Sequence, residues 1–138
     1  MVASLVVWAV SLVSAAPPRT TRDGVFSAAQ AGRGEEAFRA CAYCHGRDLR
    51  GGDDPPGPSL KGAIFQARWQ DRPLLDLFDR MVETMPRDRP GTLDPQAYAD
   101  ILAYLLSANG MPAGAQDLPP ESGTLGDIQM AGNPVGSR

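Results

Sequence analysis

Cys41, Cys44 and His45 form the group of residues in this sequence whose spacing points most directly to a definite chemistry. The cysteines stand three positions apart in the segment CAYCH, and the histidine follows immediately. On a helical turn, cysteines at this spacing face one side, where their sulfurs match the two vinyl groups along one edge of a haem. The adjoining histidine can then reach the iron. The pattern therefore predicts one covalently attached haem c, with His45 as an axial iron ligand.

Other uses of two cysteines fit the sequence less well. A thioredoxin-like C-x-x-C needs a surrounding βαβ pattern, and the sequence shows none. A zinc site needs four ligands, and no second Cys/His pair completes the set begun by Cys41, Cys44 and His45. A disulfide across positions i and i+3 of a helix is geometrically awkward. Because His45 is the only histidine, this chain cannot supply both ligands of a bis-histidine haem.

A helix is expected to lead into CAYCH. Ser27 and Gln30 have the spacing of a capping box, which begins a helix, and we expect that helix to run through Ala40 into CAYCH. Residues 46–60 are rich in Gly and Pro, so we predict an irregular loop there. A short helix is expected over 62–69.

Two clearer helices follow. The first has Pro73 at its first position and ends before Pro86. Its apolar residues recur at spacings of three and four and form one face: Leu74, Leu77, Phe78, Met81, Val82 and Met85. The second is capped by Asp94 and ends at 109–110, an Asn-Gly pair typical of helix C-termini. We expect its buried face to comprise Tyr98, Ile101, Leu102 and Leu105.

The N-terminal residues have the features of an export signal. An apolar stretch over 5–13 is followed by small residues, up to Ala16, that suit a cleavage site. We therefore expect a periplasmic protein with a signal over 1–16, and a retained membrane anchor is the alternative. We expect an arm over 17–26, a domain over 27–110, and a Pro/Gly-rich tail over 111–138 that either packs along the domain or extends from it. No strand pattern is evident, and the net charge of −3 argues against a nucleic-acid surface.

Together these motifs resemble class I cytochromes c of the short bacterial type, which occur as free periplasmic carriers or as dehydrogenase-associated domains. The resemblance covers about residues 25–128. It rests on CAYCHG (41–46), GPSLKG (57–62), ARW (67–69), ETMPRDRPGTL (83–93) and YADILAYLLSANGMPAG (98–114). It implies an all-α cytochrome c fold, with three main helices and two long loops around one haem.

The resemblance also implies roles for residues outside CAYCH. Met85 stands where the family has its second axial ligand. Periodicity alone would make it a core residue, and Met81, Met111 and Met130 are weaker candidates. Pro58 matches the proline whose carbonyl accepts a hydrogen bond from the haem histidine. Trp69, Arg68 and Arg72 are candidate partners of the haem propionates, or else surface and packing residues.

Gly34 and Phe38 match the pair at which the family's first helix crosses its last, here near Leu102. Relatives place one more residue between Phe38 and the first cysteine. We expect this difference to rotate the helix end and weaken the crossing.

The function implied is that of a one-electron carrier, and not of an enzyme in its own right. Its implied partners are a periplasmic quinoprotein or flavoprotein dehydrogenase and a terminal oxidase. Two alternatives remain at this point: a haem-based sensor or gas-binding module in which Met85 is displaced by a ligand, and a tethered cytochrome subunit of a dehydrogenase complex.

Overall fold

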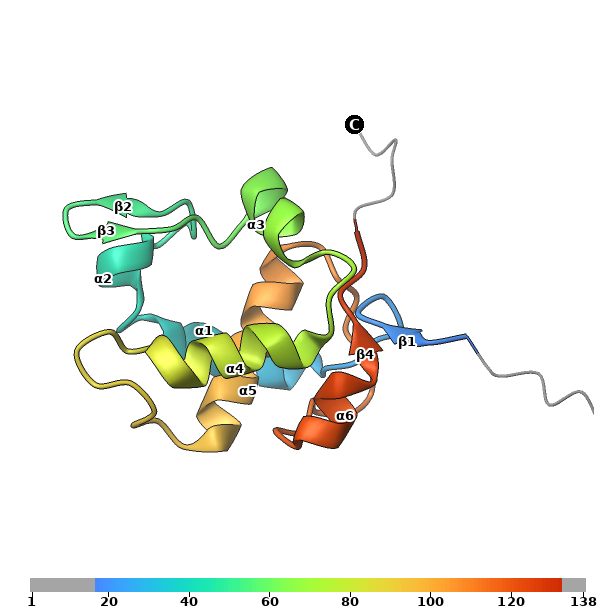
Figure 1. The fold of residues 1–138 in the computed structure, drawn as a ribbon. Coiled ribbons are helices and arrows are strands. Elements are labelled where there is room, and N and C mark those ends of the chain that lie inside the picture. The colour runs from blue at the N-terminus through green and yellow to red at the C-terminus, as the bar shows by residue number, and fades with distance from the viewer. Residues whose placement is uncertain (1–16, 133–138) are drawn as a thin grey trace, which may run out of the picture.

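The computed structural model describes residues 17–132, so the predicted export signal over 1–16 lies outside the described residues. The chain is mostly helical, as predicted (Figure 1). The helices are α1 (Ala28–Phe38), α2 (Ala42–His45), α3 (Gly62–Trp69), α4 (Leu74–Thr84), α5 (Pro95–Ala108) and α6 (Ser122–Gly126). Four two-residue strands accompany them: β1 (Arg19–Thr20), β2 (Gly52–Asp53), β3 (Pro56–Gly57) and β4 (Ile128–Gln129).

α1 begins as predicted but ends earlier. The Ser27 hydroxyl accepts a hydrogen bond from the Gln30 amide at 3.0 Å, which caps the first turn. The prediction of one helix through Ala40 into CAYCH is wrong, because α1 stops at Phe38 and α2 begins separately at Ala42. A tight turn intervenes, in which the Cys41 amide donates to the Phe38 carbonyl at 2.7 Å. This turn lets α2 leave the axis of α1.

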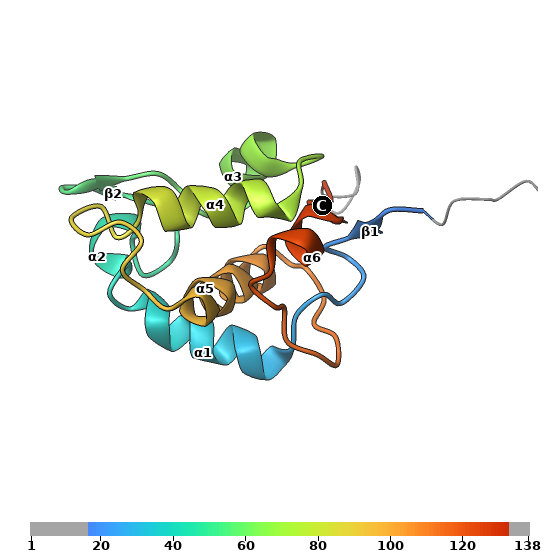
Figure 2. The ribbon, with the colours of Figure 1, turned by 60° about the horizontal axis from the view of Figure 1, so that its bottom comes forward.

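α5 is the central helix, lying between α1 and α4 (Figure 2). Asp94 caps it through a 2.9 Å hydrogen bond from the Gln96 amide, and it ends at Ala108, before the Asn-Gly pair, as predicted. Its buried side chains include all four of the predicted face. The predicted apolar face of α4 is only partly buried. Leu74, Leu77 and Phe78 are buried, whereas Met81, Val82 and Met85 are half-buried.

The crossing of α1 and α5 is formed in spite of the shorter spacing before Cys41. A Cβ atom on Gly34 would lie 1.8 Å from the Asp100 carbonyl oxygen, so only glycine allows the two backbones to approach this closely. One turn further on, the Phe38 and Tyr104 rings pack with centroids 5.4 Å apart. The residues nearest Gly34 are Asp100 and Tyr104, which lie two positions before and two positions after Leu102, so the crossing is near Leu102 as expected.

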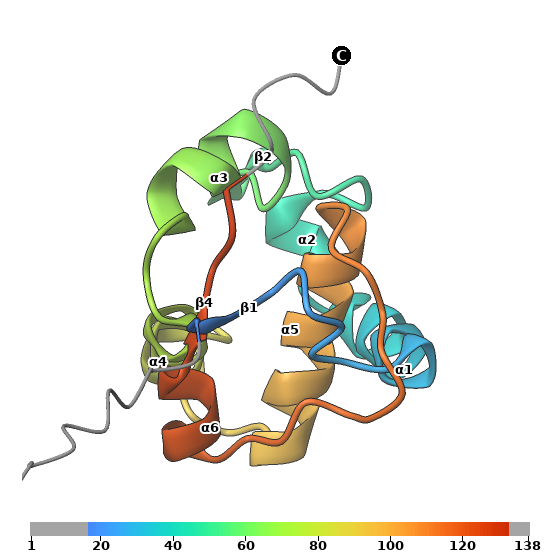
Figure 3. The same cartoon turned by 90° about the vertical axis from the view of Figure 1, so that its right-hand side faces the viewer.

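The expectation of no strands is also wrong, although the strands are minimal. β2 and β3 pair as an antiparallel hairpin inside the loop over 46–60, which was predicted to be irregular. β1 and β4 pair in parallel and join the two ends of the described chain (Figure 3). Such short pairings depend on tertiary contacts and leave little periodic signal in a sequence.

Residues 111–132 pack along the domain. Leu118, Leu125, Ile128 and Met130 are almost fully buried and belong to the main core cluster. The Met130 amide donates to the Arg72 carbonyl at 2.8 Å, and its carbonyl accepts from the Asp71 amide at 2.9 Å. These two hydrogen bonds hold the segment against the connection between α3 and α4.

Candidate functional site

Backbone packing fixes the short helix α2. A Cβ atom on Gly52 or Gly57 would lie 2.7 or 2.3 Å, respectively, from the Cys44 carbonyl oxygen. The β2–β3 hairpin can therefore lie directly against α2 only because both positions are glycine. The Gly51 amide also donates to the His45 carbonyl at 2.9 Å. These contacts hold the CAYCH segment against the hairpin that follows it.

The imidazole of His45 is oriented by the same loop. Its Nδ1 atom lies 3.0 Å from the Pro58 carbonyl oxygen. Because a carbonyl can only accept a hydrogen bond, Nδ1 carries a proton, which selects the tautomer whose lone pair is on Nε2. His45 is buried, with 7% of the residue exposed. An imidazole oriented in this tautomer is the form in which histidine binds a metal through Nε2.

Cys41 and Cys44 are free thiols, and both are half-buried. Burial raises the pKa of the Cys41 thiol, and the neighbouring Cys44 raises it further. Cys41 is the N-cap residue of α2 and Cys44 directly precedes His45, so both cysteines lie within about one turn of His45. Within residues 17–132, no three His, Cys, Asp or Glu side chains gather in the way a metal site would require.

Met85 immediately follows α4 and is held by its backbone. Its amide donates to the Met81 carbonyl at 2.9 Å, and its carbonyl accepts a 2.6 Å hydrogen bond from the Tyr98 hydroxyl. The side chain is half-buried. In Figure 1, α2 and the C-terminal end of α4 lie at the same end of the molecule; His45 is the last residue of α2, and Met85 directly follows α4.

Half-buried apolar side chains pack against the hydrophobic cluster that Cys41 and Ala42 also contact. Leu60, Met81 and Leu93 are half-buried, and each packs against both hydrophobic clusters of the protein. They come from three separate segments of the chain. Two thiols, an oriented imidazole and a thioether set among half-buried apolar side chains form a donor set that fits a haem c. These side chains could hold one, the two thiols by covalent attachment and the imidazole and thioether as iron ligands.

Trp69, Arg68 and Arg72 form a separate group at the outer face of α3 and α4. The Trp69 ring is buried, and the two guanidinium groups lie over it at 5.6 Å and 5.2 Å, respectively, from its centroid. Arg72 also pairs with Asp76 at 2.8 Å. These side chains line a shallow hollow of about 380 Å³ that also includes Asp79, Arg80 and Glu83. The geometry shows packing and surface contacts for all three.

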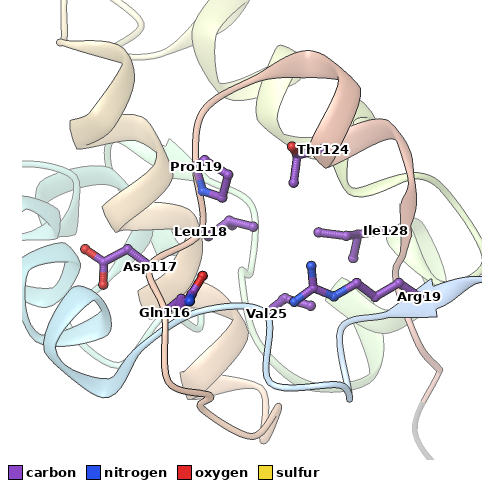
Figure 4. Close-up of a pocket in the computed structure, with 8 residues that line it drawn as sticks. All are labelled: Arg19, Val25, Gln116, Asp117, Leu118, Pro119, Thr124 and Ile128. Atoms are coloured by element: carbon purple, nitrogen blue, oxygen red, sulfur yellow. The ribbon is translucent and has the colours of Figure 1, made fainter.

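A second hollow lies between the N-terminal arm and the segment after α5 (Figure 4). It has a volume of about 330 Å³, and Leu118 and Ile128 point into it. Asp117 points away from it and is engaged by the Ser27 hydroxyl and by Arg33. The other lining residues are Arg19, Val25, Gln116, Pro119 and Thr124. None of the candidate haem-binding residues belongs to this hollow.

Sequence reasoning overlooked two features of the site. It assigned Tyr98 only to the buried face of α5, although a buried tyrosine hydroxyl normally needs a hydrogen-bond partner, and that requirement could have flagged it. It also gave Gly52 and Gly57 no role. Glycines near two consecutive prolines indicate a turn. The sequence alone does not show that this turn packs its glycines against the Cys44 carbonyl.

Comparison with family models gave one match. The family described as cytochrome c oxidase, cbb3-type, subunit III matches residues 29–105, which is more than half of the chain. The matched range begins in α1 and ends in α5, and it contains Cys41, Cys44, His45 and Met85. Comparison with curated proteins and with solved structures gave no match.

Proposed function

The chain belongs to the family of c-type cytochrome domains described as cytochrome c oxidase, cbb3-type, subunit III, and on this basis we propose that it carries single electrons in a periplasmic respiratory or dehydrogenase-linked chain. Domains of this family bind haem c covalently and serve as electron-transfer modules. They are typically exported or anchored to a membrane. Among residues 17–132, no helix combines the length and the apolar character needed to span a bilayer.

We assign the covalent attachment to Cys41 and Cys44, which are the only cysteines in the chain. The observation that carries this assignment is the CAYCH segment on α2, with the His45 ring oriented by the Pro58 carbonyl. When bound, the haem supplies an iron that cycles between Fe(III) and Fe(II).

His45 and Met85 are the proposed axial ligands. The hydrogen bond from Nδ1 to the Pro58 carbonyl fixes the ring's orientation and tautomer and strengthens Nε2 as a donor. A thioether from Met85 favours reduced iron, and this ligand pair therefore raises the potential. Leu60, Met81 and Leu93 would exclude water from the site. The chain thus supplies binding, orientation and an apolar environment, and the redox chemistry belongs to the cofactor.

The family is associated with subunits of cbb3-type oxidases. We propose a terminal oxidase as the electron acceptor and a periplasmic quinoprotein or flavoprotein dehydrogenase as the donor. The chain then acts as a carrier rather than as an enzyme in its own right, although it could serve as a subunit of an oxidoreductase complex.

The test is to produce the full chain in a bacterium that attaches haem in its periplasm. We expect the protein to keep its haem through denaturing electrophoresis, and a potentiometric titration to follow a single one-electron curve. In Cys41→Ser, the yield of holoprotein should fall sharply. Complete loss of the haem stain from the wild type on denaturation would contradict covalent attachment.

Carbon monoxide separates the carrier from a gas-binding module. A carrier in which Met85 stays bound should show little change in its reduced spectrum when the gas is added. Rapid, stoichiometric binding would contradict the carrier and favour the sensor. Recovery of the protein from membranes together with a dehydrogenase would favour the tethered subunit.

A further inference from the structure

The hydroxyl of Tyr98 ties the start of α5 to the end of α4. Tyr98 lies in the first turns of α5 and is 2% exposed. Its hydroxyl donates to the Met85 carbonyl at 2.6 Å. The connection between the two residues along the chain is the loop over 86–93. A single side chain therefore bridges this loop and ends on the backbone of the proposed methionine ligand.

The tyrosine is itself held firmly. Its amide donates to the Asp94 carbonyl at 3.2 Å, within the capped first turn of α5. Its ring packs edge-on against Phe78 of α4, with centroids 6.4 Å apart and planes at 75°. The direction of the hydroxyl is thus set by two helices, and a short hydrogen bond from so fixed a donor restrains its acceptor.

Met85 has few other restraints on its C-terminal side. Its carbonyl also accepts from the Gly91 amide, but at 3.4 Å. The amide of Met85 is anchored to Met81 in the last turn of α4. Removing the Tyr98 hydroxyl would leave the carbonyl with only the longer contact, so the residue could swing about the end of α4.

We propose that Tyr98 is a positioning residue for Met85: through the Met85 carbonyl, its hydroxyl holds the backbone that presents the thioether, and so it limits how readily the methionine leaves the iron. The inference rests on the proposed His45/Met85 ligation. This role acts through the Met85 backbone and does not require Tyr98 to contact the haem or the iron. Its consequence is kinetic as well as structural, because a looser Met85 exposes the sixth coordination position.

The test compares Tyr98→Phe with Tyr104→Phe. Both tyrosines lie on α5, and both variants lose one hydroxyl, but Tyr104 packs against Phe38 at the crossing with α1. In reduced Tyr98→Phe, we expect carbon monoxide to bind about three- to tenfold faster than in wild type, which matches the value of one hydrogen bond. Tyr104→Phe should bind carbon monoxide at the wild-type rate.

A second readout separates positioning from general destabilisation. On heating, the charge-transfer band of sulfur-ligated ferric haem should disappear from Tyr98→Phe well before the helical circular dichroism is lost. In wild type and in Tyr104→Phe, the two transitions should coincide or lie closer together. If Tyr98→Phe matches Tyr104→Phe in both readouts, the positioning role is overturned. If the wild type lacks the band, or if Met85→Leu keeps it, the proposed Met85 ligation is wrong. Failure of the ligation is thereby distinguished from failure of the positioning role of Tyr98.

Discussion

The Nδ1 atom of His45 lies 3.0 Å from the carbonyl oxygen of Pro58. This contact joins α2 to the residue that directly follows β3, and it defines the tautomer of the only histidine in the chain. In the reduced, diamagnetic holoprotein, we therefore expect an Nδ1–H resonance from His45 that exchanges slowly with solvent, because the ring is buried and the proton is bonded. Nitrogen-resolved NMR would detect it. A ring whose Nδ1 proton exchanges as fast as that of a free imidazole would contradict the contact.

The crossing of α1 and α5 should tolerate no side chain at Gly34. A Cβ atom there would meet the Asp100 carbonyl at 1.8 Å, so Gly34→Ala must push the helices apart. We expect a loss of about 1–3 kcal/mol or more in the free energy of unfolding. Gly32→Ala is the matched control in the same helix, because a Cβ atom at Gly32 meets nothing within 4 Å. It should stabilise the protein by roughly 0.5–1 kcal/mol, as denaturant titration would show. Equal effects of the two substitutions would refute the close crossing.

The segment after α5 should behave as part of the core. Leu118 is fully buried, and its amide and carbonyl both hydrogen-bond the side chain of Gln30. We expect Leu118→Ala to lower the free energy of unfolding by about 2–5 kcal/mol. Ile64→Ala, at a side chain that is 68% exposed, should change it by less than about 0.5 kcal/mol. A Leu118→Ala variant as stable as Ile64→Ala would mean that residues 111–132 contribute little to the fold.

Asp100 should contribute to stability above its titration range and lose that contribution in acid. Burial raises the pKa of this carboxyl, but hydrogen bonds from Arg33 and Gln96 lower it more, so its pKa in the folded protein is below the ordinary value. Since the unfolded chain has the higher pKa, the contribution is present above about pH 4 and disappears as the pH falls through the folded pKa. Asp100→Asn should therefore be less stable at pH 7 and show a flatter loss of stability in acid. An unchanged acid slope would show that Asp100 is not responsible.

Local signals were enough to predict the bounds of α3 and α5. α5 has an acidic cap followed by proline at one end and Asn-Gly at the other, and its observed bounds agree with the prediction. α3 was likewise predicted over its observed range. The chemistry of the CAYCH segment could also be predicted, because the spacing of its two cysteines and its histidine is read directly from the sequence. Both kinds of inference depend only on residues that are close together along the chain.

The features that were missed depend on contacts between distant segments. α1 ends at Phe38, although no proline or glycine marks the position, because α2 has to turn toward the glycines of the β2–β3 hairpin. The buried residues after α5 stand singly among prolines and glycines, so they show no helical or strand period. The Tyr98 hydrogen bond to Met85 spans thirteen residues, and no local pattern encodes it.

The central claim is that Met85 completes the coordination of a haem already bound at CAYCH, and the spectrum of the oxidised protein tests it most directly. The wild type should show the weak long-wavelength charge-transfer band of sulfur-ligated ferric haem. Met85→Leu nearly preserves the side-chain volume, so it should cost less than about 1.5 kcal/mol of stability while abolishing the band and lowering the potential. A Met85→Leu protein that retains the band and the wild-type potential would contradict the account and move the ligand elsewhere, with Met81 the next to be tested.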